Sequence, residues 1–331
     1  MNFYTIALNT AVDTVIQVNN VHPDGVAEGE ITQKTAAGKG LNVARDLQII
    51  SREREEYSLI TVLGFVGQEE SAFFEDELAR WHLQNRLVPV PGHTRENITI
   101  LQPKTEQEQH IKTQSYTVHK AEFERFLNRL NGIPSHAPVF LCGSLPAGIS
   151  NKRLEEIMQT LKRTGARVIC DTAPAAYNPL LPYEPALLKP NVCELEEWAG
   201  SEIRNWSELS STLQKITGDR TSVLLSLGAE GAIAYHKDRM TAGRCRVSPE
   251  RIRSTVGAGD SLLASFVFHQ LRGLSMEDCL TKALAFATAN CLHSDTGNVD
   301  LKQAQTLEPE VKILTETDAA EHFEQALNKL R

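Results

Sequence analysis

Paired cysteines are the first thing that this sequence lacks. Its 331 residues include six cysteines, with no C-x-x-C pair and no cysteine–histidine cluster at zinc spacing. They stand at positions 142, 170, 193, 245, 279 and 291. Cys142 and Cys170 each end an apolar run, which favours buried thiols over disulfides. The pattern argues against a disulfide-built secreted scaffold and against a structural zinc site.

Long apolar runs and an excess of positive charge are also missing. No apolar stretch approaches the roughly 20 residues that span a bilayer, and no apolar N-terminal segment with a cleavage site is present. Lysine and arginine number 34 against 42 aspartates and glutamates, a formal net charge of -8. This balance argues against nucleic acid or an anionic membrane as the main partner. We expect a cytoplasmic protein with small-molecule ligands.

What the sequence does have is a regular alternation of helical and strand patterns from about residue 120 onward. Apolar runs at 138–142, 167–171 and 222–226 each follow a helical pattern, which predicts parallel strands covered on both faces. A hydrophobic content of 41 % over this length suffices for a sizeable core. We therefore predict an α/β fold for 1–331 as a single domain, with a mostly parallel central sheet and helices on both faces.

Sheets of this kind bind ligands beyond the carboxyl ends of their strands. The residues that stand just past predicted strand ends are Gly143, Asp171, Lys189, Ser226 and Gly257. We expect them to share one crevice.

Two early segments do not follow this rhythm. Residues 12–35 and 88–118, approximately, alternate polar and apolar side chains as half-exposed strands do. A small sheet standing away from the central one would accommodate them. Such a sheet could be a lid that closes over the crevice, or the contact surface of a homodimer, and the two roles are compatible.

The stretch Arg253–Phe268 carries the clearest chemical signal. Gly257, Ala258 and Gly259 lack bulk, so backbone N–H groups can approach an anion where an apolar helix begins. Asp260 follows in the first turn of that helix. A carboxylate beside an anion cradle suits the removal of a proton during phosphoryl transfer. Taken alone, the same pattern also fits a tight turn with a helix-capping aspartate.

A second glycine-rich start lies near the N-terminus. Gly38 and Gly40 permit close approach of a ligand to the backbone, and Asn42 offers both a donor and an acceptor. Lys39 adds a cation between these two glycines, which could pair with an anionic ligand. A solvated surface lysine is the alternative for Lys39 considered without its neighbours.

Seven segments follow one another along the chain: Leu8–Asp13, Ala37–Arg45, Thr94–Ile98, Gly143–Gly148, Lys189–Glu194, Ser226–Gly231 and Thr255–Asp260. Together and in this order they make the chain resemble the ribokinase-like (PfkB) carbohydrate kinases, in the branch of 1-phosphofructokinase and tagatose-6-phosphate kinase. The resemblance implies a ribokinase-like fold with a β-sheet lid. It also implies phosphoryl transfer from ATP with Mg²⁺, catalysed by Asp260 as base and by the N–H groups of 257–260.

The resemblance assigns a role to each matching position on the sugar side. Asp13 would hold sugar hydroxyls, and Ser144 would offer a hydroxyl nearby. Lys39 and Arg95 together would neutralise the substrate phosphate, Arg95 with a bidentate fork. The full substrate-binding set is Asp13, Gly38, Lys39, Gly40, Asn42, Arg95 and Ser144.

The ATP-binding set that the resemblance implies is Lys189, Asn191, Ser226, Gly228, Gly231 and Asn290. Asn191 and Glu194 have the spacing of a helix cap with its box partner as well. Magnesium takes few protein ligands, so Glu194 would act on the metal indirectly, through water. For Asn290 the alternative is simple packing.

These roles imply a kinase that converts fructose 1-phosphate to fructose 1,6-bisphosphate. Tagatose 6-phosphate and fructose 6-phosphate are alternative substrates. A regulator that binds sugar phosphate or nucleotide without catalysis is an alternative of another class, and the intact Asp260 counts against it. Two departures bear on the choice of sugar. Ala37 stands where the branch has a glycine, and Thr105–Tyr116 lacks the usual lid pattern.

Overall fold

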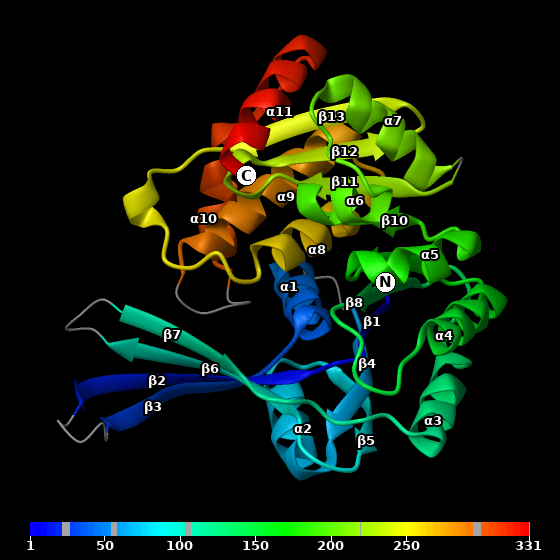
Figure 1. Cartoon of the computed structure of the whole chain (residues 1–331), viewed down its shortest axis with the longest axis vertical. Helices are drawn as coiled ribbons and strands as arrows, with labels where there is room; N and C mark the ends of the chain where they lie inside the picture. The colour runs from blue at the N-terminus through cyan, green and yellow to red at the C-terminus, as the bar shows by residue number, and fades with distance from the viewer. Residues whose placement is uncertain (22–26, 54–57, 103–106, 219, 294–298, 331) are drawn as a thin grey trace.

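Two β-sheets organise the chain in the computed structural model (Figure 1). The structure describes residues 1–21, 27–53, 58–102, 107–218, 220–293 and 299–330. Residues 22–26 and 103–106 fall inside the two segments predicted as lid strands, and those parts of the prediction lie outside the described residues.

The large sheet has the strand order β14-β13-β12-β11-β10-β9-β8-β1-β4-β5. The pairs from β11 to β5 are parallel, and β12, β13 and β14 continue the sheet antiparallel beyond β11. In chain order the strands are β1 (Phe3–Ala7), β4 (Ile60–Gly67), β5 (Gln84–Val90), β8 (Pro138–Cys142), β9 (Arg167–Asp171), β10 (Leu187–Leu188), β11 (Ser222–Ser226), β12 (Ala232–His236), β13 (Arg239–Cys245) and β14 (Val311–Ile313). The predicted mostly parallel central sheet is confirmed.

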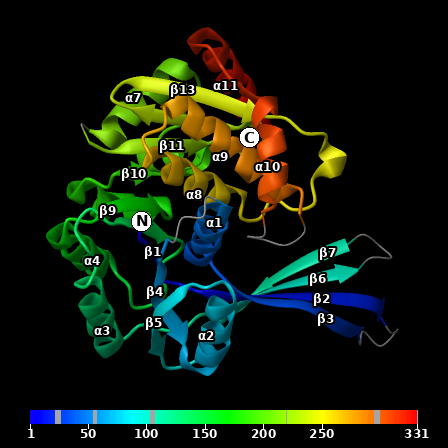
Figure 2. The same ribbon diagram turned by 180° about the vertical axis from the view of Figure 1, so that it is seen from behind.

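Helices cover both faces of the large sheet, as Figures 1 and 2 show from opposite sides. One face carries α1 (Lys39–Glu53), α2 (Ser71–Arg80), α8 (Ala258–Gln270), α9 (Met276–Cys291) and α10 (Leu301–Leu307). The other carries α3 (Lys120–Leu130), α4 (Asn151–Thr164), α5 (Tyr177–Leu180), α6 (Val192–Ala199), α7 (Trp206–Thr217) and α11 (Glu316–Leu330). Double coverage explains why β4 and β8 are apolar and buried along their whole length.

Helix α8 is enclosed on almost every side. Its sequence, AGDSLLASFVFHQ, mixes small and large apolar residues, and every residue from Asp260 to His269 is buried. The small side chains of Ser261, Ala264 and Ser265 let α1 and α9 approach it closely. The start of α8 is thereby fixed against the start of α1. Among the helices that the structure describes, none is long and apolar enough to cross a bilayer.

The small sheet projects from one side of the body (Figure 1). Its strands are ordered β3 (Ala27–Ala37), β2 (Ala11–Val21), β6 (Arg95–Gln102) and β7 (Gln107–Lys112). β2 pairs with β6 in parallel, and the two outer pairs are antiparallel. β3 is mostly exposed because no second layer covers it, and Ile31 on this strand is 60 % exposed. Residues 88–90 belong to β5 of the large sheet instead.

Candidate functional site

The ends of neighbouring parallel strands bring the predicted crevice residues together. Gly143 follows β8, and its N–H donates to the carbonyl of Asp171 at the end of β9. The N–H of Lys189, just after β10, donates to the carbonyl of Cys170. Ser226, at the end of β11, donates its N–H to Pro190. The expected convergence at the carboxyl edge of the sheet is therefore present.

Asp171 lies between two lysines at the centre of this edge. Lys39 Nζ donates to Asp171 Oδ1 at 2.8 Å, and Lys189 Nζ lies 3.1 Å from Oδ2 as an ion pair without the alignment of a hydrogen bond. The Asp171 side chain is fully buried, whereas that of Lys39 is 41 % exposed. Burial alone would lower the pKa of Lys39, but attraction to Asp171 and Asp260 outweighs it and raises that pKa. Lys39 is thus a permanent cation that reaches solvent.

Asp260 lies in the first turn of α8 and is buried. Asn42 Nδ2, from α1, donates to Asp260 Oδ2 at 2.8 Å across 218 positions of sequence. Burial, followed by repulsion from Asp171, raises the pKa of Asp260 to about 6, against the opposing effects of Asn42 and the two lysines. A carboxylate with this pKa is ionised at neutral pH, yet it binds a proton more readily than an exposed aspartate.

The turn before Asp260 has the shape that its glycines predict. Gly257 is the N-cap of α8 with φ of 80°, a conformation that a side chain rarely adopts. A Cβ added at Gly259 would lie 3.4 Å from Lys189 Nζ, so the absence of a side chain lets the lysine approach the helix N-terminus. N–H groups of this first turn lack partners within the helix. Together with Lys189 they form a positive corner beside Asp260.

The predicted sugar-side residues meet around Asn9 and Thr10, which link β1 to β2. Arg95 Nη2 and Nε approach the carbonyls of Asn9 and Thr10 at 3.5 and 3.4 Å. Asn9 Nδ2 donates to Ser144 Oγ at 3.0 Å. Gly38, with φ of 122°, lies against the same segment. The two contacts of Arg95 are long, so a bound anion could compete for its guanidinium.

Asp13 lies at the base of the small sheet. It is in register with Asn97 on the parallel strand β6, and Asn97 Nδ2 donates to Asp13 Oδ1 at 2.7 Å. Burial is the largest cause of a raised pKa for Asp13, and Asn97, Arg45 and Arg95 oppose it. The small sheet thus presents one carboxylate and one guanidinium, Asp13 and Arg95, toward the same end of the crevice.

A cavity of about 770 Å³ adjoins the first turn of α8. Its lining includes three of the predicted ATP-binding residues, Ser226, Gly228 and Gly231, together with Ala258 and Gly259 of the turn. Leu262, Leu284, Ala287 and Thr288 from α8 and α9 supply another wall. The cavity is large enough for a nucleotide and opens next to the proposed base.

Three residues of the predicted ATP-binding set, Lys189, Asn191 and Asn290, do not line this cavity, and neither does Glu194. Asn191 is the N-cap of α6 and forms a complete capping box with Glu194, at 2.8 and 2.9 Å. Asn290, buried on α9, donates from Nδ2 to the carbonyl of Val256 at 2.8 Å and so supports the turn before Gly257. Asn191 and Glu194 thus form the helix cap that the sequence offered as an alternative to a nucleotide contact. Asn290 likewise has the packing role that was its alternative.

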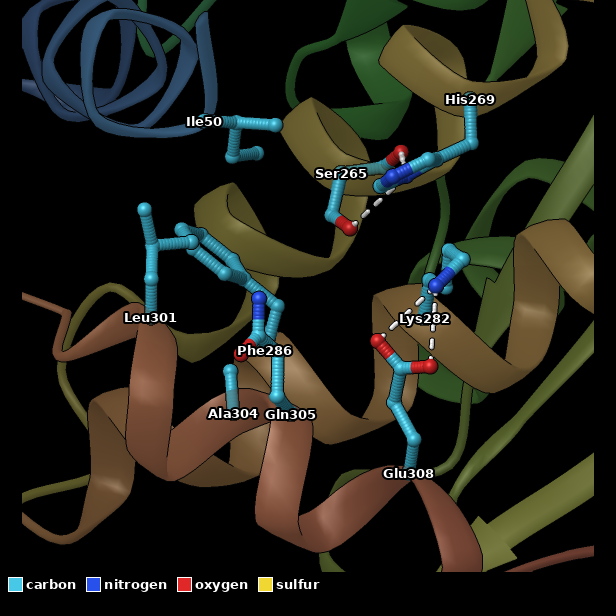
Figure 3. A pocket seen from close by; sticks show the side chains of 9 residues that line it. All are labelled: Ile50, Ser265, His269, Lys282, Phe286, Leu301, Ala304, Gln305 and Glu308. Carbon is cyan, nitrogen blue, oxygen red and sulfur yellow. Dashed lines mark hydrogen bonds and ion pairs between the residues drawn. The ribbon is translucent and has the colours of Figure 1, made fainter. Parts of the chain in front are cut away.

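Another hollow, of about 320 Å³, lies between α1, α8, α9 and α10 (Figure 3). Its charged groups neutralise each other, because Lys282 Nζ contacts both carboxylate oxygens of Glu308 at 2.9 and 2.8 Å. His269 Nδ1 donates to the carbonyl of Ser265 at 2.8 Å. The described residues around it include none of the predicted site residues. It is a packing gap on the far side of α8.

Sequence reasoning missed Asp171 as a site residue, although it placed it at the crevice. The signal was its position directly after a buried strand, but its two lysine partners are distant in sequence. Asn9, Asn97 and Asp46 were also missed. Asn9 and Asn97 stand inside segments that carry the family resemblance, so their positions were available as signals, whereas Asp46 depends on a tertiary contact.

Asp46 is a carboxyl group buried beneath the site. Ser261 Oγ, next to Asp260, donates to Asp46 Oδ2 at 2.9 Å, and Asp46 Oδ1 has no hydrogen-bond partner among the described residues. Burial is the largest cause that raises the pKa of Asp46 well above its usual range, and repulsion from Asp260 raises it further. The hydrogen bond from Ser261 and attraction to Arg45 lower this pKa, but by less. The folded protein therefore retains a proton on Asp46 over a range where the unfolded chain releases it.

Asp46→Asn is expected to stabilise the protein increasingly as pH rises. The native pKa lies above the unfolded value, so wild-type stability declines as pH rises from about 4 toward the native pKa. The amide that replaces the Asp46 carboxyl group does not titrate, so the free energy of unfolding of the variant does not decline in this way. Urea unfolding at several pH values should show the two proteins converging in acid and separating toward neutrality. A constant difference would show that folding does not raise the pKa of Asp46.

The sequence and the fold of the chain both resemble those of known proteins. A family model described as pfkB family carbohydrate kinase matches residues 6–304. The 1-phosphofructokinase of Haemophilus influenzae is 30 % identical over 92 % of this chain and 95 % of the relative. A tagatose-6-phosphate kinase of Staphylococcus epidermidis is 27 % identical over 94 % and 98 %. Escherichia coli phosphofructokinase-2 in complex with potassium superposes with a TM-score of 0.84 at 22 % identity, covering 93 % of this chain and 98 % of that one.

Proposed function

The chain belongs to the pfkB family of carbohydrate kinases, and from this premise we propose that it phosphorylates fructose 1-phosphate with ATP, giving fructose 1,6-bisphosphate. The observation that carries the proposal is the position of Asp260. It directly follows Ala258 and Gly259, which line the cavity of about 770 Å³, and it accepts a hydrogen bond from Asn42 of α1. Relatives named 1-phosphofructokinase support the choice of sugar phosphate. Tagatose 6-phosphate is the second candidate because relatives of that name match equally long stretches.

In the proposed mechanism Asp260 accepts the proton of the attacking sugar hydroxyl. The hydroxyl oxygen forms a bond to the γ-phosphorus of ATP, and the bond to the bridging oxygen breaks as ADP leaves with its electrons. Lys189 and the N–H groups of the first turn of α8 stabilise the charge on the transferring group. Asn42 orients the Asp260 carboxylate by donating to Oδ2.

The acidic residues near the lysines fit a magnesium ion held mainly through water. Glu194 lies close enough to Lys39 to contribute to its raised pKa, and carboxylate oxygens are the donors that Mg²⁺ prefers. When bound, Mg²⁺ would neutralise charge on the ATP phosphates. Glu194 would then orient the hydrated ion, while its Oε2 continues to cap α6.

A coupled assay of ADP release across fructose 1-phosphate, tagatose 6-phosphate, fructose 6-phosphate and fructose tests the function. The proposal requires turnover with fructose 1-phosphate at the highest kcat/KM of the four. A preference for another phosphorylated sugar would reassign the substrate within the family. Binding of sugar phosphate and nucleotide without ADP release would instead identify a non-catalytic regulator.

Lys39→Ala is expected to raise the KM for the sugar phosphate about 10- to 100-fold, the weight of a lost charged hydrogen bond, with a much smaller change for ATP. The reason is that its side chain, 41 % exposed, lies against Gly143, the residue before Ser144, on the sugar side of the crevice. Lys120→Ala on α3, which removes a lysine that is 84 % exposed, is the control. Equal changes in the KM values for the sugar phosphate and for ATP would indicate that Lys39 contacts the transferring phosphoryl group instead.

The small sheet is also the proposed contact of a homodimer. Ile111 on β7 is 47 % exposed, and Ile31 on β3 is more exposed still, so the sheet offers apolar surface that a second copy could bury. Ile111→Glu should shift a dimer toward monomer in analytical ultracentrifugation. Leu59→Glu, at a similarly exposed apolar residue outside this sheet, should leave it intact. A monomeric wild-type protein would contradict the proposal.

A further inference from the structure

The family match ends at residue 304, yet the chain continues into an ordered element that contacts the nucleotide cavity. β14 adds to the edge of the large sheet, and α11 then packs over β13 and α7 (Figure 1). Phe323, fully buried, anchors this helix and meets the ring of Trp206 edge-on at 6.0 Å. α11 is therefore a fixed part of the body.

Residues in the middle and at the end of α11 hold the loop that follows β11. The carbonyl of Glu230 accepts a hydrogen bond of 2.7 Å from His322 Nε2, and the Glu230 carboxylate lies 2.7 Å from Lys329 Nζ. A Cβ at Gly228 would lie 3.5 Å from Leu330 Cδ2, so the helix end also packs against the start of this loop. One helix thus contacts both the backbone and the side chain of a loop whose glycines were predicted to face ATP.

Lys329 does more than pair with Glu230, because it lines the same cavity as Gly228 and Gly231. Its side chain is 59 % exposed, whereas that of Glu230 is 14 % exposed. The hydrogen bond from Lys329 is the largest cause of a lowered pKa for Glu230, so the carboxylate at this rim is ionised. Without Lys329, the cavity would present that negative charge, partly offset by Arg246 at 3.8 Å, to an anionic ligand.

We propose that the C-terminal helix completes the nucleotide site: α11 holds the loop Gly228–Gly231 through Glu230, and Lys329 contributes a cation for the phosphates of a bound nucleoside triphosphate. This rests on the proposed kinase function, since it assigns the cavity to ATP. Both the hold of α11 on the loop and the cation of Lys329 come from residues beyond 304, where the match to the family model ends. Lys329 acts on the ligand, and Glu230 acts by positioning Lys329 and the loop.

Lys329→Ala is expected to raise the KM for ATP about two- to fivefold, the weight of one partly screened charge, with kcat and the KM for sugar phosphate unchanged. Lys329→Arg should restore most of the affinity, and added salt should shrink the difference between variant and wild type. Lys302→Ala, which removes an exposed lysine from α10, the α-helix that precedes α11 in the sequence, is the matched control. A KM for ATP equal to that of wild type would overturn the role of Lys329.

Glu230→Gln separates the two contributions. If Lys329 contacts the nucleotide directly, adding Lys329→Ala to Glu230→Gln raises the KM for ATP further; an unchanged KM would leave the lysine as a mere loop anchor and overturn the proposal. ADP binding to the full-length protein, measured by calorimetry without sugar, tests the kinase function and the role of Lys329 separately. Wild-type protein that binds no ADP would refute the kinase function itself. Wild type and Lys329→Ala that bind ADP equally would refute only this inference.

Discussion

Asp260→Asn is expected to fold like the wild-type protein and to lose about 10²- to 10⁴-fold in kcat, the usual contribution of a general base. The amide has the shape of the carboxylate and can turn its oxygen toward Asn42 Nδ2, which preserves the 2.8 Å contact between α1 and α8. It cannot accept the proton of the sugar hydroxyl. Steady-state assays with ATP and the sugar phosphate, together with a thermal melt, measure both effects.

Asp278→Asn supplies a closely matched control. Asp278 is the third residue of α9, as Asp260 is of α8, and its carboxylate accepts from Ser275 Oγ at 2.7 Å. Both changes replace a carboxylate in the first turn of a helix, but only Asp260 adjoins the lysines and the cavity. Loss of activity in both variants would indicate a general effect on helix stability. Wild-type kcat in Asp260→Asn would remove the base assignment.

The start of α8 could be predicted from the sequence because its signals are local. Gly257 needs a positive φ, the residues that follow are small and apolar, and Asp260 stands within the first turn. The alternation of strands and helices from residue 120 likewise depends on periodicity within short windows. Once that alternation predicts parallel strands, the position of Gly143, Asp171 and Lys189 at one edge follows from topology.

The pairing of charges could not be predicted in the same way. Lys39 and Asp171 are 132 positions apart, and the sequence does not say which lysine a buried carboxylate will hold. Asp13 and Asn97 meet only because β2 and β6 pair in parallel with one particular register. For Asn191 and Glu194 the sequence allowed both a helix cap and a nucleotide contact, and the two hydrogen bonds between these residues show the cap.

The C-terminal helix shows a different limit. Its amphipathic pattern is typical of a helix packed on the body of a protein, and Phe323 and Leu327 are buried as that pattern requires. Its approach to Glu230 depends on the hairpin of β12 and β13 and on β14, which together fix where α11 begins. A pattern of apolar residues identifies the buried face of a helix, but not the loop that the polar end of the helix will meet.

Asp171→Asn is expected to have the second large effect, on stability as well as on activity. Removing one partner of a buried ion pair costs about 3 kcal/mol or more, because the remaining charge stays desolvated. Lys189 would keep a desolvated charge, because its side chain is only 6 % exposed. The side chain of Lys39, which is 41 % exposed, can turn to solvent. Urea unfolding should show a lower free energy of unfolding, and kcat/KM should fall because both lysines lose their fixed positions.

The pH dependence of the residual activity separates electrostatics from simple loss of structure. Repulsion from Asp171 is the second cause, after burial, of the pKa of about 6 at Asp260. Wild-type kcat/KM should therefore fall as pH drops through about 6, where the base becomes protonated. In Asp171→Asn one negative neighbour is gone and the lysines still attract the carboxylate, so the acid limb moves to lower pH. A structural defect would lower the whole profile without moving the limb, and an unmoved limb would show that Asp171 does not act on Asp260.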